Sequence, residues 1–125
     1  MLCGVGIDLF DTRRLERELA LDGRRLLRSL FTPDEIAACV HGRASVARLA
    51  ACFAGKEAVA KALSLDGSLG LPWRRIEVLE RPGAPAEVRL HGVLAERARG
   101  LGVARIRLSL VRRRVLVLAA AFAES

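Results

Sequence analysis

The segment 44–63 constrains the fold more than any other, because it predicts one long helix that is apolar on almost every side. The segment is rich in alanine and has one internal glycine, Gly55. At about 100° per residue, Leu49 and Phe53 share a stripe with other apolar residues, and Cys52 helps to make the opposite side apolar too. We therefore expect this helix to be buried and the rest of the chain to fold around it.

Three charged residues interrupt the apolar stretch FAGKEAVAKAL, residues 53–63, of this helix: Lys56, Glu57 and Lys61. The two lysines are the only ones in a chain whose other cationic residues are all arginine. Glu57 falls on the apolar stripe, where a carboxylate is costly unless it meets a cation, a metal ion or hydrogen-bond donors. One interpretation is an internal Glu57–Lys61 ion pair at i,i+4. The other is a site that binds a metal ion or an anion.

Asp8 favours the second interpretation. It follows the apolar run GVGI, which predicts a buried strand ending near Asp8, whereas Asp11 and Thr12 are better placed to cap the next helix. Two carboxylates from separate elements, Asp8 and Glu57, suit Mg²⁺, which takes one or two protein carboxylates and completes its coordination with water and substrate phosphates. A nearby lysine would neutralise phosphate charge.

The remaining segments predict an α+β domain over residues 1–125. A first helix is expected over 11–31, with a break at Gly23. A second should begin at the capping box Thr32–Glu35 and end near His41–Gly42, and a further short helix is expected over 92–102. Strands are expected over 73–80, 86–92, 104–111 and 115–124, with a loop over 64–72. This order predicts a small mixed or antiparallel sheet packed against the long buried helix.

Composition limits the partners. A net charge of +7 predicts an anionic partner, and the scarcity of aromatic residues, 4% of the chain, argues against nucleic acid. No run approaches about eighteen apolar residues and no signal peptide is present, so we expect a soluble cytoplasmic protein without membrane contact. The three cysteines, Cys3, Cys39 and Cys52, are too widely spaced for a disulfide framework, and we expect reduced core thiols.

Three motifs resemble one known family over essentially the whole chain. They are GVGIDLFDTRRL at the N-terminus, LFTPDEI in the middle, and FAGKEAVAKAL followed by W-x-x-I-E-V. Together they are similar to the holo-acyl-carrier-protein synthases, the small trimeric group of 4′-phosphopantetheinyl transferases. The resemblance implies the fold of that group and a homotrimer with sites at the subunit interfaces.

The resemblance also implies the reaction and the residues that perform it. Family members transfer the 4′-phosphopantetheine arm of coenzyme A to a serine of an apo acyl or peptidyl carrier protein and release 3′,5′-ADP. By resemblance, Asp8 and Glu57 hold Mg²⁺, Glu57 or a water deprotonates the serine, Lys61 contacts the phosphates, and Lys56 faces the nucleotide. Arg14 stands where relatives grip the acidic helix of the carrier protein.

The chain departs from the family pattern around the expected nucleotide pocket. Cys52 replaces an arginine, Ser64 replaces a glycine, and the closing S-x-S/T-H strand reads SLVR, with Val111 and Arg112 at its end. Leu116 stands where a tyrosine is common. We expect Ser64 and Arg112 to contribute to coenzyme A binding, with Arg112 reading the 3′-phosphate. The departures leave an alternative: a member that has lost transferase activity and binds a carrier protein, or acts on a carrier-bound substrate.

Overall fold

The computed structural model describes residues 1–65 and 70–125, and its elements follow the predicted order. The strands of the described residues are β1 (Leu2–Asp11), β2 (Ile76–Arg81), β3 (Ala84–Leu90), β4 (Arg105–Arg113) and β5 (Leu116–Glu124). The helices are α1 (Thr12–Leu30), α2 (Pro33–Cys39), α3 (Ser45–Ala62) and α4 (Val93–Gly100), with 3-10 turns at Gly42–Ala44 and Trp73–Arg75. Part of the predicted loop over 64–72, residues 66–69, lies outside the described residues.

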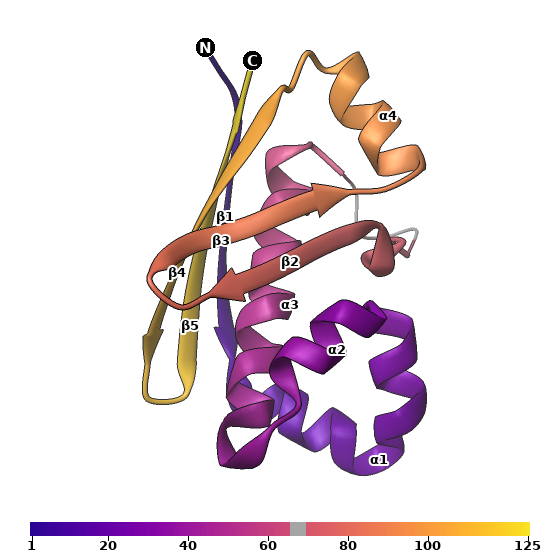
Figure 1. The fold of residues 1–125 in the computed structure, drawn as a ribbon, viewed down its shortest axis with the longest axis vertical. Helices are drawn as coiled ribbons and strands as arrows, with labels where there is room; N and C mark the ends of the chain where they lie inside the picture. The colour runs from indigo at the N-terminus through magenta and orange to yellow at the C-terminus, as the bar shows by residue number, and fades with distance from the viewer. Residues whose placement is uncertain (66–69) are drawn as a thin grey trace.

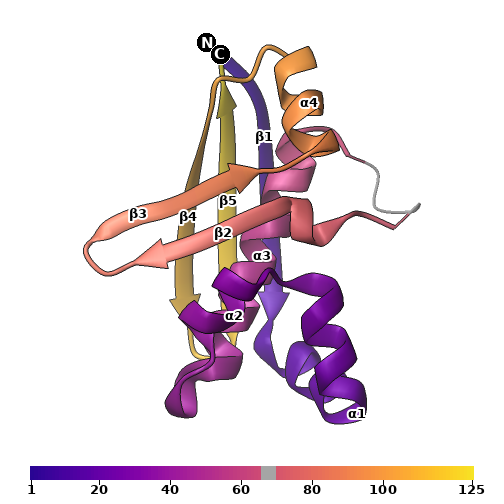
Figure 2. The ribbon, with the colours of Figure 1, turned by 45° about the vertical axis from the view of Figure 1, so that its right-hand side comes forward.

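The strands form two antiparallel sheets rather than one. β5 is central in the three-stranded sheet β1-β5-β4, and β2 and β3 form a separate hairpin. Figure 1 shows α3 running beside β1 with the hairpin crossing it, and Figure 2 shows the same crossing from a second direction. The predicted α+β class is confirmed, and the predicted sheet is purely antiparallel where pairing is described.

Helix α3 is the centre of the core, as predicted. Most of its residues are buried, including Leu49, Cys52 and Phe53. Strand β1 reaches it closely because Gly4 and Gly6 have no side chains: a Cβ atom at Gly6 would lie 1.9 Å from the carbonyl oxygen of Ala58 on α3. The two glycines of GVG therefore set the distance between β1 and α3, and they fix where Asp8, two residues later, meets the helix.

The first two helices begin where their capping residues predict. Asp11 caps α1 by accepting a hydrogen bond from the backbone N–H of Arg13 at 2.9 Å. Thr32 and Glu35 form the predicted capping box of α2. The expected break in the first helix lies at Asp22, whose backbone is non-helical, and not at Gly23. Helix α2 ends at Cys39, short of the predicted His41–Gly42.

The outer face of the three-stranded sheet is apolar and exposed along β1 and β5, while β4 adds the exposed Arg107 and Arg113 at its edge. Side chains alternate along β1, so Gly6, Asp8 and Phe10 face α3 while their neighbours face outward. The large apolar residues exposed on this outer sheet face are Val5, Ile7, Leu9, Val111, Leu116, Leu118 and Phe122. No helix among the described residues has the length and apolar character needed to cross a membrane.

The cysteines divide into two groups. Cys39 and Cys52 are buried free thiols, as predicted, while Cys3 is exposed. The prediction of a core thiol is therefore wrong for Cys3, because it lies near the start of β1, where the pairing with β5 shifts register between Leu2 and Gly4 and both Leu2 and Cys3 are exposed.

Candidate active site

The predicted carboxylates come together between β1 and α3. Asp8 is 6% exposed, and its Oδ2 atom is buried without a hydrogen-bond partner. The pKa of Glu57 is raised from near 4.5 to about 7, chiefly by burial and then by the neighbouring Asp8 carboxyl, against the opposing charges of Arg14 and Lys61. The buried carboxylate of Asp8, with its unpartnered oxygen, and the half-buried carboxylate of Glu57 form an anionic site that calls for a cation or a proton.

The donor set of this site fits Mg²⁺. Within residues 1–65 and 70–125, no three His, Cys, Asp or Glu side chains converge as a complete protein cage for a metal ion. Mg²⁺ does not need one, since it keeps several waters and binds through one or two carboxylates plus substrate phosphates. Asp8 and Glu57 supply the two carboxylates. The buried Oδ2 of Asp8 accepts no hydrogen bond, so its lone pairs are available to a metal ion.

Lys61 pairs with Asp8. Its Nζ atom lies 3.1 Å from Oδ1 of Asp8 and donates a hydrogen bond to the carbonyl oxygen of Ile7 at 3.0 Å. Glu57 is not within ion-pair distance of Lys61 among the described contacts, so the interpretation of an isolated i,i+4 pair is wrong. The Lys61 side chain is 53% exposed, so its ammonium group can reach an anion that approaches from solvent.

Lys56 does not face a ligand site, which corrects the expectation that it contacts the nucleotide. The residue is 0% exposed, and its Nζ atom lies 2.6 Å from Oε1 of Glu35. It also donates hydrogen bonds to the carbonyl oxygens of Trp73 at 2.9 Å and Ile76 at 2.6 Å. An ammonium group has three donors, and these partners use all of them.

Glu35 is the polar centre that sequence reasoning missed. Its Oε1 accepts from the backbone N–H of Thr32 at 2.8 Å and pairs with Lys56, while Oε2 accepts from the N–H of Val78 at 2.8 Å and from the thiol of Cys52 at 3.1 Å. The capping box revealed the role of Glu35 within its own helix. Its long-range partners on α3 and β2 left no periodic signal in the sequence.

Ser64 lies at the C-terminus of α3 in the left-handed conformation, with φ of 56°. Its N–H donates to the carbonyl of Lys61, and the N–H of Leu65 donates to that of Ala60, each at 3.0 Å. These two bonds form a Schellman motif, whose left-handed position favours glycine. The left-handed backbone therefore explains why the resembling family has a glycine at this position. Ser64 adopts this left-handed conformation although it carries a side chain.

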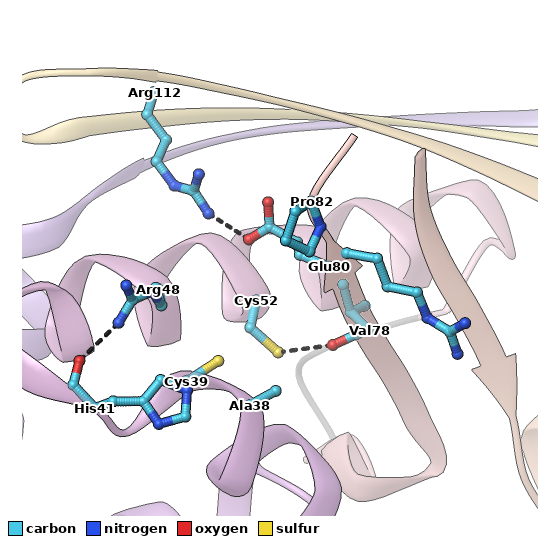
Figure 3. A pocket seen from close by; sticks show the side chains of 10 residues that line it. Ala38, Cys39, His41, Arg48, Cys52, Val78, Glu80, Pro82 and Arg112 are labelled. Atoms are coloured by element: carbon cyan, nitrogen blue, oxygen red, sulfur yellow. Dashed lines mark hydrogen bonds and ion pairs between the residues drawn. The ribbon is translucent and has the colours of Figure 1, made fainter. Parts of the chain in front are cut away.

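Arg112 and Cys52 line a common pocket of about 460 Å³, although one lies on β4 and the other on α3. Figure 3 shows Arg112 pairing with Glu80 across this pocket, while Arg48 donates to the carbonyl of His41 at 2.7 Å. The residues that line the pocket are Ala38, Cys39, His41, Arg48, Cys52, Val78, Glu80, Arg81, Pro82 and Arg112. The pocket is basic, and two of the sequence departures meet in it.

The other departures lie elsewhere. Val111 and Leu116 are 41% exposed on the outer sheet face, which is the side of the sheet opposite to α3. Cys52 precedes Glu57 by five residues, which places them about 140° apart around α3. The basic pocket and the carboxylate pair therefore occupy different sides of the helix within one chain.

Arg14 is exposed on α1. Its guanidinium lies 5.6 Å from the ring centroid of Phe10 and 3.4 Å from Glu18. It is among the cations whose charge lowers the pKa of Glu57, so Arg14 lies at the edge of the carboxylate site. The surface of α1 around it carries further exposed arginines: Arg13, Arg17, Arg24, Arg25 and Arg28.

Comparisons with known proteins identify the family of the chain. The chain is 40% identical over 110 residues to a holo-[acyl-carrier-protein] synthase of Halorhodospira halophila, covering 88% of this chain and 87% of that protein. It is 36% identical over 126 residues to one of Solibacter usitatus, with 100% of each covered. The crystal structure of the synthase from Neisseria meningitidis matches with a TM-score of 0.87 and 28% identity over 100% of both chains. The family model of the 4′-phosphopantetheinyl transferase superfamily matches residues 4–110, and the chain belongs to that superfamily.

Proposed function

We propose that this chain is a magnesium-dependent holo-acyl-carrier-protein synthase. It transfers the 4′-phosphopantetheine arm of coenzyme A to a serine of an apo acyl or peptidyl carrier protein and releases 3′,5′-ADP. The observation that carries the proposal is the meeting of Asp8, Glu57 and Lys61, with one carboxylate oxygen left unpartnered. Family membership and the names of the relatives support the reaction type.

The three residues have complementary roles in this reaction. Mg²⁺ held by Asp8 and Glu57 would neutralise the pyrophosphate of coenzyme A. Glu57, or a water beside it, accepts the proton of the carrier serine, as a general base in contact with the reacting hydroxyl would. The serine oxygen forms a bond to the β-phosphorus, and the bond from that phosphorus to the 3′,5′-ADP oxygen breaks. Lys61 lies beside the site and stabilises the charge of the leaving group.

The basic pocket is the candidate site for the 3′-phosphate of coenzyme A. Arg112 stands at the position of the family histidine, and it lines the same pocket as Cys52, which replaces the family arginine. A guanidinium binds phosphate through two parallel hydrogen bonds, so Arg112 can supply the charge that Cys52 does not. Ser64, at the end of α3, is the other proposed coenzyme A contact.

A homotrimer would combine these two parts. The pocket and the carboxylates lie on different sides of α3, so one complete site needs the pocket of one chain and the carboxylates of another. The outer sheet face supports such an assembly, because its exposed residues, which include Ile7 at 58% and Leu9 at 64%, form a contiguous apolar surface. A second copy of the chain is the proposed occupant of that face.

The arginines of α1 are the proposed docking surface for the carrier protein. Arg14 lies at the edge of the carboxylate site, where it can bind an acidic helix and place the carrier serine near Glu57. The proposed compartment is the cytoplasm, which is consistent with a chain whose buried cysteines are free thiols.

The test is incubation with coenzyme A, Mg²⁺ and a panel of apo carrier proteins, followed by intact-mass measurement of each carrier. The proposal expects addition of one phosphopantetheine group to at least one carrier. The replacement of two family residues in the pocket favours one second candidate, a protein that binds a carrier or acts on a carrier-bound substrate without this transfer. Carrier binding with no mass addition to any carrier would support that candidate.

A further inference from the structure

Two of the three cysteines form a pair in the basic pocket. Cys39 is the last residue of α2 and is 9% exposed, while Cys52 lies on α3 and is 1% exposed. Both line the pocket of about 460 Å³, and Figure 3 shows their sulfur atoms between α2 and α3, near Val78 of β2. The proposed transfer reaction uses neither thiol, and the exposed Cys3 lies apart from them near the start of β1.

The surroundings of the pair make the two thiols different. The proximity of the two thiols is the largest influence on both: it lowers the pKa of Cys39 and raises the pKa of Cys52, which burial and Glu35 raise further. The charge of Arg48 also lowers the pKa of Cys39, against burial and the carboxylates of Glu35 and Glu80. Cys39 is therefore the thiol that ionises more readily, and it borders a pocket open to small molecules.

We propose that Cys39 and Cys52 are a redox-active pair that hydroperoxides convert to an intramolecular disulfide linking α2 to α3. The thiolate of Cys39 attacks the peroxide oxygen, which gives a sulfenic acid and releases water once the leaving oxygen is protonated. The Cys52 sulfur then attacks the Cys39 sulfur, its proton goes to the departing hydroxide, and a second water leaves. Overall, one dithiol and one hydrogen peroxide yield one disulfide and two waters.

The disulfide would alter the pocket through contacts that the reduced thiols now make. Cys52 donates to Oε2 of Glu35 at 3.1 Å and to the carbonyl of Val78 at 3.5 Å, and a disulfide has no proton to donate. Cys39 is two residues from His41, whose carbonyl holds Arg48 at 2.7 Å. Drawing Cys39 toward α3 therefore moves a basic residue of the pocket. On the proposed function, which this consequence requires, oxidation weakens coenzyme A binding.

The first measurement tests the disulfide alone and needs no activity. The purified chain is treated with a small excess of hydrogen peroxide, its remaining thiols are alkylated under denaturing conditions, and its mass is compared with that of the reduced chain. The expected result is loss of two hydrogen atoms and one remaining free thiol, Cys3. Trypsin should then release peptides 29–43 and 49–56 as one linked species that dithiothreitol separates. A linkage through Cys3, or no loss of hydrogen, would overturn the proposal.

The second measurement tests the consequence for the site. Titration of coenzyme A in the transfer assay should give a several-fold higher apparent KM for the oxidised chain, restored by dithiothreitol. Cys52→Ser keeps a hydroxyl donor toward Glu35 but cannot form the disulfide, so peroxide should no longer change its KM. Cys3→Ser is the matched control and should stay peroxide-sensitive. An unchanged KM after complete disulfide formation would overturn the regulatory role, whereas a reduced parent chain without any transfer would overturn the proposed function and leave the disulfide result standing.

Discussion

The ammonium nitrogen of Lys61 lies 3.1 Å from Oδ1 of Asp8, joining residues from α3 and β1 that are 53 positions apart. The other oxygen of the same carboxylate is buried without a donor, and Glu57 adds a second carboxyl beside it. Cation and carboxylates are thus held on rigid elements, and packing of the glycine-containing strand against α3 sets their spacing. This arrangement is suited to a divalent cation next to a phosphate.

Removal of either carboxylate should abolish transfer without unfolding the protein. Asp8→Ala and Glu57→Ala each delete a proposed magnesium ligand, and each also relieves the repulsion between the buried carboxyl of Asp8 and the half-buried carboxyl of Glu57. We expect transfer to fall by at least about 100-fold, the lower end of the effect of a missing catalytic group. Single-turnover assays over a magnesium titration measure the loss, and Asp34→Ala, which removes an exposed carboxylate, is the control. Near-normal turnover of either variant would show that the site is assigned wrongly.

The two lysines of α3 should fail in different ways. Lys56→Met leaves the carboxylate of Glu35 buried without its cation, a change that costs about 3–5 kcal/mol of unfolding free energy. Lys61→Met removes a half-exposed ammonium and should lower transfer while destabilising the fold less. Urea denaturation and transfer assays on both variants make the comparison. Equal stability of the two variants would contradict the structural role of Lys56.

Much of the fold could be predicted from local signals, because caps and periodicity act within a few residues. The capping box of Thr32 and Glu35 located the start of α2, and the alanine-rich segment predicted the buried helix. The role of Lys56 could not be predicted, since its partner Glu35 lies 21 positions away and on another helix. Lys56 and Lys61 both belong to the motif FAGKEAVAKAL. Only the packing of α2 on α3 distinguishes the buried Lys56 from the exposed Lys61.

The candidate site was predictable in its residue types but not in its pairing. The position of Glu57 on an apolar stripe predicts a carboxylate that needs a partner. The sequence leaves two candidates for that partner, Lys61 and a metal ion. The structure pairs Lys61 with Asp8, because the close approach of β1 brings Asp8 to the helix. That approach depends on contacts between glycines and a helix more than fifty positions away, which sequence periodicity does not encode.

Ser64→Gly should stabilise the protein. Ser64 has φ of 56°, and a residue with a Cβ in the left-handed region costs roughly 1–2 kcal/mol that glycine avoids. After the greater backbone entropy of glycine in the unfolded chain is subtracted, we expect about 0.5–1 kcal/mol of added unfolding free energy. Chemical denaturation measures it. Gly23→Ser is the control, because it exchanges the same two residue types at a helical position without a positive φ. A Cβ atom added at Gly23 would have no neighbour within 4 Å. A loss of stability in Ser64→Gly would mean that the serine side chain makes a contact worth more than the strain.

The stability of the metal-free protein should depend on the protonation of Glu57. Because its pKa is raised from near 4.5 to about 7, the folded state binds more protons than the unfolded state between these values, and stability falls as pH rises through that window. The difference in urea midpoint between the parent and Glu57→Gln, measured in EDTA from pH 4.5 to 7.5, isolates this contribution. Excess Mg²⁺ should reduce the slope, since a bound cation favours the ionised carboxylate. A parent and variant with parallel pH profiles would contradict the assignment.

Arg112 should discriminate coenzyme A from dephospho-coenzyme A. It lines the basic pocket with Cys52, and its guanidinium pairs with Glu80, so a phosphate can compete for a charge that is already held in place. Arg112→Ala should weaken coenzyme A binding by about 1.5–3 kcal/mol, the scale of a hydrogen bond to a charged group, and leave dephospho-coenzyme A nearly unaffected. Calorimetric titration of both ligands measures the difference. Arg113→Ala removes a neighbouring exposed charge that does not line the pocket, so it should weaken the two ligands equally. Equal losses for both ligands in Arg112→Ala would mean that Arg112 does not bind the 3′-phosphate.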